Sequence, residues 1–113
     1  MRVEELGEVP LIERLARVFS QQPGGAPAPP PESGSRLLIG IGDDAAAWEA
    51  PASTQVLTTD TMVEGVHFER RYTPWPDLGW KAMAVNLSDV AAMGCVPLYS
   101  VVTLGLPPDT QVE

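Results

Sequence analysis

The stretch "LLIGIGDDAAAWEA", residues 37–50, places two adjacent aspartates directly after an apolar run that contains two glycines. The run is rich in Leu and Ile and therefore favours a β-strand. A carboxylate at the end of a buried strand loses much of its hydration, so Asp43 and Asp44 call for a compensating cation. The following "AAAWEA" is compatible with an extension of this strand or with the start of a hairpin.

The composition limits the partners of the chain. Its 113 residues, 44% of them hydrophobic, suit one domain with a modest core. Fifteen acidic residues against seven basic ones give a net charge of −8. This excludes direct binding to nucleic-acid phosphates, which requires clustered Lys and Arg. An acidic protein still binds polyphosphates when a divalent cation bridges the two.

The sequence also indicates a compartment. Cys95 is the only cysteine, which precludes an internal disulfide and fits a reducing cytosol. The amino end carries three glutamates before residue 9 and has no apolar core typical of a signal peptide. No apolar stretch approaches the length that a bilayer requires. We therefore expect a cytoplasmic protein without a membrane partner.

Hydrophobic periodicity predicts an α+β fold. The pattern favours a helix over residues 9–22, strands over 36–42, 55–63 and 96–107, and a second helix from about Asp77 to Met93, with Gly94 as its C-cap. We expect a mixed or antiparallel sheet with helices packed on one face. Residues 23–35 hold five prolines and three glycines and predict a flexible insertion between an amino-terminal helix (1–22) and the main domain (36–113).

Several acids fall inside apolar elements, where oxygen ligands for a cation would be held by the backbone. Mg²⁺ takes hard oxygen ligands, commonly one or two carboxylates together with substrate phosphates. The candidate residues are Asp43, Asp44, Asp60 and Asp89, with the hydroxyls of Thr58, Thr59 and Thr61 and the carboxylate of Glu64 nearby.

Each of these signals also has a simpler interpretation. Threonine favours strands, so "TTDT" (58–61) is compatible with a strand that ends in a turn. "NLSD" (86–89) is compatible with a solvated helix face. The single histidine, His67, is compatible with a structural hydrogen bond as well as with a substrate contact.

The order of three motifs is more specific than any one of them. "GIGDDAA" at 40–46 is followed by "TTDTMVEGVHF" at 58–68 and "GWKAMAVNLSDVAAMG" at 79–94. This order resembles the amino-terminal domain of the thiamine-monophosphate kinase family, within the superfamily of aminoimidazole ribonucleotide synthetase. The resemblance implies the ATP-binding and dimerisation domain of that fold, and therefore a homodimer.

The resemblance also implies a reaction, the transfer of the γ-phosphoryl group of ATP to thiamine monophosphate, which yields thiamine diphosphate. Such a transfer depends on positioning and charge neutralisation rather than on a covalent nucleophile, so no catalytic side chain is assigned. Carried over by motif, the implied Mg²⁺ ligands are Asp44, Asp60 and Asp89, with Thr58 and Thr59 as further oxygen ligands and Asp43 as an assisting residue or a turn former. His67 resembles the substrate contact of the family.

The family's later Gly-Gly-Asp motif and carboxyl-terminal domain are absent from these 113 residues. We therefore expect the main domain to be truncated and the chain alone not to turn over. Two alternatives stay open. One is another ATP- and Mg²⁺-dependent member of the superfamily. The other is a non-catalytic module that dimerises and binds Mg²⁺ or nucleotide.

Overall fold

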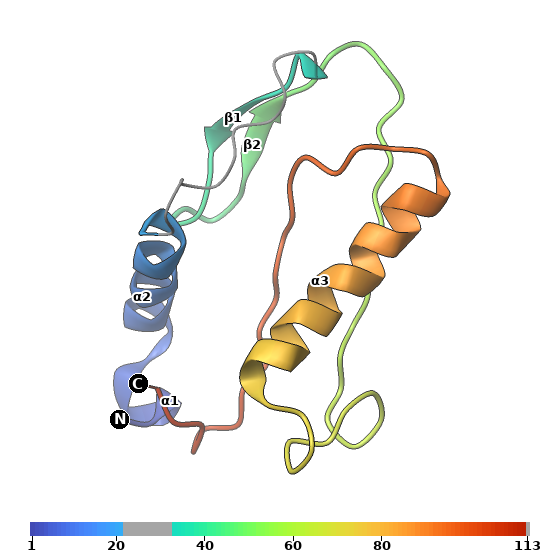
Figure 1. Ribbon diagram of the computed structural model, residues 1–113. Coiled ribbons are helices and arrows are strands. Elements are labelled where there is room, and N and C mark those ends of the chain that lie inside the picture. The colour runs from blue at the N-terminus through green and yellow to red at the C-terminus, as the bar shows by residue number, and fades with distance from the viewer. Residues whose placement is uncertain (22–32, 113) are drawn as a thin grey trace. The chain divides into compact units, whose positions relative to one another are not determined.

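The computed structural model describes residues 1–21 and 33–112 (Figure 1). The described chain forms two compact units. Unit 1 comprises Met1–Ser53 and Val101–Glu113, and unit 2 comprises Thr54–Ser100. Most of the predicted proline-rich insertion, residues 23–32, lies outside the described residues. The division separates the Asp-Asp motif, in unit 1, from the other two motifs, in unit 2.

Unit 1 begins with two helices, α1 (Val3–Leu6) and α2 (Glu8–Ser20). Gly7, which separates them, has a φ of +81° that favours glycine. The helix predicted over residues 9–22 is thus present as α2. It ends where the backbone N–H of Gln21 donates to the carbonyl of Arg17 at 3.0 Å.

The last described residues of unit 1 are hydrogen-bonded to its first residues. The backbone N–H of Val3 donates to the carbonyl of Thr110 at 2.9 Å, and that of Val112 donates to the carbonyl of Met1 at 2.8 Å. Arg2 and Gln111 form an antiparallel bridge at this place. Backbone hydrogen bonds therefore join two segments that are distant in sequence, which no sequence motif had indicated.

The sheet of unit 1 is an antiparallel hairpin of β1 (Arg36–Ile39) and β2 (Ala47–Glu49). Arg36 pairs with Glu49 in the register, and the Arg36 Nε donates to the Glu49 carboxylate at 3.0 Å. This contact lowers the pKa of Glu49, first through the hydrogen bond and then through the opposite charge. Of the two interpretations of "AAAWEA", the hairpin is the one observed.

Unit 2 holds a single helix, α3 (Trp75–Ala92), and otherwise irregular chain. Two of the predicted strands are wrong for this structure: residues 55–63 and 96–107 form no strand among the described residues. Strand propensity reflects how well side chains fit a pleated surface, whereas a strand forms only when a neighbouring chain completes its hydrogen bonds. Together with the hairpin, the helices confirm an α+β chain, whose strands among residues 1–21 and 33–112 make a single two-stranded sheet.

No apolar side chain among the described residues is buried. Leu57 in unit 2 is 94% exposed and Val101 in unit 1 is 83% exposed, and both lie in segments that were predicted as strands. The modest core expected from the composition is therefore not observed within either unit. In the described part of the chain, no helix combines the length and the apolar character that a membrane span needs.

Candidate metal and substrate site

Helix α3 provides the frame of the candidate site. Pro76 lies within its first two positions and Asp77 in its first turn, both of which favour a helix start. Past its end, Gly94 adopts a φ of +68° and donates its N–H to the carbonyl of Ala91 at 2.9 Å. The predicted helix and its terminating glycine are thus confirmed, with a start two residues earlier than expected.

Asp89, near the end of α3, contacts the extended segment that contains "TTDT". The Thr58 hydroxyl donates to Oδ2 of Asp89 at 3.0 Å, across 31 positions of sequence. Thr58 and Asp89 are both in unit 2, so this contact is internal to one compact body. This hydrogen bond brings together two motifs whose order along the chain was known from the sequence but whose contact was not.

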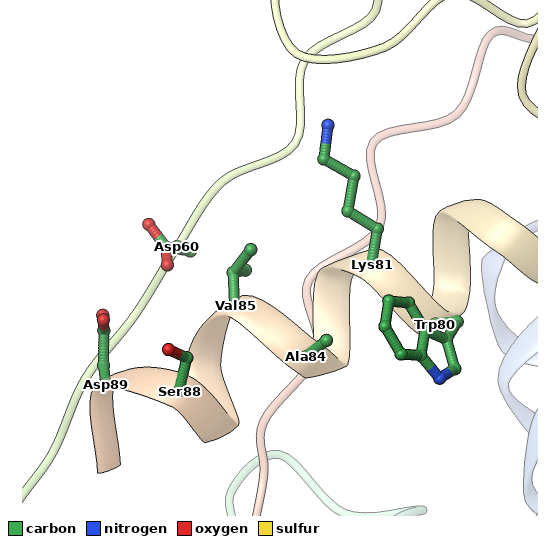
Figure 2. A pocket seen from close by; sticks show the side chains of 7 residues that line it. All are labelled: Asp60, Trp80, Lys81, Ala84, Val85, Ser88 and Asp89. Atoms are coloured by element: carbon green, nitrogen blue, oxygen red, sulfur yellow. The ribbon is translucent and has the colours of Figure 1, made fainter. Parts of the chain in front are cut away.

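Asp60 and Asp89 line the same open hollow of about 340 Å³ on α3, which we call the acidic hollow. Figure 2 shows both carboxylates on the same side of the helix, with the Asp60 segment running alongside it. The remaining lining residues are Trp80, Lys81, Ala84, Val85 and Ser88. The hollow therefore offers carboxylate and hydroxyl oxygens on an otherwise largely apolar helix face.

The donor set of this hollow suits a hard divalent cation only in part. No ion pair of residues 1–21 and 33–112 involves Asp60 or Asp89, so neither carboxylate is neutralised by Lys or Arg there. No three His, Cys, Asp or Glu side chains of these residues gather closely enough to hold a metal ion. Since Mg²⁺ commonly takes one or two carboxylates and completes its shell with water and phosphate oxygens, the two aspartates fit that incomplete kind of site.

The other predicted ligands are placed differently. Thr59 is exposed on the segment between Thr58 and Asp60 and does not line the hollow. Asp43 and Asp44 lie in the connection between β1 and β2, where the N–H of Asp44 donates to Oδ1 of Asp43 at 2.8 Å. Both are exposed and belong to unit 1. The structure thus brings three of the predicted residues together within unit 2.

His67 belongs to a tight loop, residues 63–68, which we call the His67 loop. The Val63 N–H donates to Nδ1 of His67 at 3.1 Å, and the His67 N–H donates back to the Val63 carbonyl at 2.8 Å. Gly65 has a φ of +80° and donates to the Phe68 carbonyl at 2.8 Å. Because Nδ1 accepts a hydrogen bond, a neutral His67 carries its proton on Nε2 and can donate from there.

The His67 loop borders a second open hollow, of about 330 Å³. Its lining comprises Gly65, Val66, His67, Phe68, Glu69, Tyr72 and Thr73. Beside it, the Arg71 guanidinium lies 4.5 Å from the centre of the Tyr72 ring. The candidate substrate contact and the candidate metal ligands thus line separate hollows of the same unit.

Sequence reasoning missed Lys81. This residue lines the acidic hollow, and its Nζ donates to the backbone carbonyl of His67 at 2.6 Å. Helical spacing was the available signal, since Val85 and Asp89 follow Lys81 at four and eight positions along α3. Asn86, by contrast, donates its side-chain amide to the carbonyl of Ala82 in its own helix at 2.9 Å.

Comparison with known proteins places the chain in a family. The family model described as AIR synthase related protein, N-terminal domain, matches residues 42–113, more than half of the chain. The chain belongs to the AIR synthase related family. All three motifs lie within or at the edge of the matched range. A comparison with solved structures found no match to this member of the AIR synthase related family.

Relatives of this AIR synthase related chain include proteins named thiamine-monophosphate kinase. The one from Bacillus subtilis is 50% identical over 74 residues, covering 65% of this chain and 23% of the relative. The one from Aquifex aeolicus is 38% identical over 113 residues, covering 100% of this chain and 31% of the relative. The chain therefore spans between about a quarter and a third of the length of these relatives.

Proposed function

We propose that this chain carries the metal-binding half of the active site of an ATP-dependent kinase that converts thiamine monophosphate to thiamine diphosphate. The observation that carries the proposal is the contact between Thr58 and Asp89, with Asp60 in the same hollow. These residues belong to two of the three motifs that resemble the kinase family, and relatives of that name are 38–50% identical to the chain over the aligned residues.

In the proposed reaction, an oxygen of the thiamine monophosphate phosphate forms a bond to the γ-phosphorus of ATP. The bond between that phosphorus and the β–γ bridging oxygen breaks, and ADP leaves with the electron pair. No side chain of this chain needs to act as a nucleophile. The proposed contribution of the chain is to hold the ion that neutralises phosphate charge and to orient the two substrates.

Asp60 and Asp89 would hold Mg²⁺, together with oxygens of Thr58 and Thr59. The motif resemblance also implies Asp44 as a Mg²⁺ ligand, with Asp43 as an assisting residue or a turn former. The ion would neutralise phosphate charge, which a chain of net charge −8 cannot do by itself. His67 would donate from Nε2 to the thiamine monophosphate, since its Nδ1 is occupied by the Val63 N–H.

We further propose that the protein acts as a cytoplasmic homodimer. The apolar side chains left exposed within each unit support a partner surface, because large exposed apolar areas on soluble proteins commonly mark interfaces. Sedimentation of the purified protein at several concentrations tests this proposal. A monomer at all concentrations would contradict it.

The decisive experiment starts from the gene. Its coding sequence beyond the codon for Glu113 is determined, and the encoded protein is assayed for thiamine diphosphate formation from thiamine monophosphate, ATP and Mg²⁺. Product formation supports the kinase. Binding of Mg²⁺–ATP without turnover would instead favour a non-catalytic module, and turnover of a different acceptor would favour another activity within the superfamily.

A further inference from the structure

We propose that Lys81 is a positioning residue that holds the His67 loop against helix α3 and thereby sets the place of His67 relative to the acidic hollow. The inference rests on the proposed kinase function for its catalytic readout. It concerns a residue to which the motif resemblance assigned no role.

The first support is the contact itself. The Lys81 ammonium donates to the His67 carbonyl at 2.6 Å, across 14 positions of sequence. A hydrogen bond from a charged donor is shorter and stronger than one between neutral groups. Lys81 takes part in none of the ion pairs within residues 1–21 and 33–112, although the chain has 15 acidic residues. The ammonium is therefore directed to a neutral backbone oxygen.

The second support is the internal closure of the His67 loop. Four hydrogen bonds close the loop on itself: two between Val63 and His67, one from the Val66 N–H to the Val63 carbonyl, and one from the Gly65 N–H to the Phe68 carbonyl. A loop closed in this way moves as one piece, so a single outside contact at His67 can orient all of it. Lys81 provides that contact from a regular helix.

The third support is the place of Lys81 on α3. It lines the acidic hollow together with Asp60 and Asp89, and Figure 2 shows its side chain extending outward from the helix. Asp89 lies eight positions after Lys81, which corresponds to roughly 12 Å along a helix axis. Helix α3 therefore connects Asp89, the candidate metal ligand, to Lys81, which contacts the loop of the candidate substrate residue His67.

Steady-state kinetics can distinguish this role from direct phosphate binding. A phosphate-binding lysine would be needed for ATP affinity, and its loss would raise the KM for ATP. A positioning lysine acts through His67, so its loss raises the KM for the phosphate acceptor and leaves the KM for ATP unchanged. The two roles therefore differ in which substrate is affected.

The test uses the protein encoded by the intact gene, with Lys81→Met, Lys81→Arg and the control Arg17→Met. Arg17→Met removes the same charge from an exposed pair with Glu13 in unit 1. We expect Lys81→Met to raise the KM for thiamine monophosphate about tenfold, as for one lost charged hydrogen bond. We expect less than about a twofold change in the KM for ATP, and recovery to within about threefold of wild type in Lys81→Arg.

Hydrogen exchange of residues 63–68 provides a second readout that does not depend on activity. Lys81→Met should accelerate exchange in this loop, while Lys81→Arg and Arg17→Met should not. If the wild-type protein makes no thiamine diphosphate, the kinase proposal fails, and the exchange data alone decide on the contact. Unchanged exchange in Lys81→Met, or an equal rise in both KM values, would overturn the inference.

Discussion

Replacement of Asp89 by Asn tests the metal site most directly. The change keeps the size and shape of the side chain and removes its charge. The amide introduced by Asp89→Asn retains an oxygen that can accept the Thr58 hydroxyl, which now donates to Oδ2 of Asp89 at 3.0 Å. Because Asp89 is exposed, the free energy of unfolding should change by less than about 0.5 kcal/mol.

The effect on activity should be far larger than the effect on stability. Asp60 and Asp89 are the two carboxylates of the hollow, so the variant removes half of its negative charge. Loss of a partner that merely orients a metal ligand typically costs about 10–100-fold. Loss of a ligand should therefore lower kcat/KM by at least about 100-fold, which corresponds to about 2.7 kcal/mol of transition-state stabilisation.

The assay measures thiamine diphosphate formation over a range of Mg²⁺ concentrations, with urea unfolding of the same preparations. The matched control is Asp77→Asn, the same change on the same helix at an exposed residue that does not line the hollow. It should leave activity unchanged and cost about 0.3–1 kcal/mol through the helix dipole. Near-normal turnover of Asp89→Asn with an unaltered Mg²⁺ requirement would refute the assignment of the site.

Three further predictions concern the Thr58 hydroxyl, two glycines of unit 2 and the Glu49 carboxyl. Thr58→Val should lower the unfolding free energy by about 0.5–1.5 kcal/mol in urea titrations, whereas Thr58→Ser, which keeps the hydroxyl, should lower it less. Gly65→Ala, at a φ of +80°, should cost about 1–2 kcal/mol in the same titrations. Gly79→Ala, in helix α3 with open space around it, should instead stabilise by about 0.5–1 kcal/mol, and equal effects at the two glycines would contradict the backbone argument. Glu49 should titrate below its ordinary pKa of 4.5, so its stabilisation of the hairpin is present above pH 4.5 and is lost as the pH falls through the lowered pKa. Carbon-13 titration of the Glu49 carboxyl checks this, and Arg36→Gln should return its midpoint to the ordinary value.

Part of the candidate site could be predicted from residue types alone. Asp60 and Asp89 stood out because acids are costly within apolar elements, and the structure places both in one hollow. Lys81 did not stand out, because a lysine on a helix is ordinarily a solvated residue. Its hydrogen bond goes to the backbone carbonyl of His67. Every residue has a backbone carbonyl, so residue type does not indicate this partner.

The sequence by itself determined the two longer helices and the family. The helical pattern, Pro76 in the first turn and Gly94 past the end define α3, and the motif order is sufficient for membership of the AIR synthase related family. These properties depend on residues close together along the chain, so they can be predicted without knowledge of the tertiary structure.

Only the tertiary structure decided which distant groups meet. The hydrogen bond between Thr58 and Asp89 joins residues 31 positions apart, and the pairing of Val3 with Thr110 joins the two ends of unit 1. Residues 55–63 and 96–107 have strand-like composition but form no strand within the described chain. The physical reason is the same in each case: a hydrogen bond needs two partners, and one segment of sequence specifies only one of them.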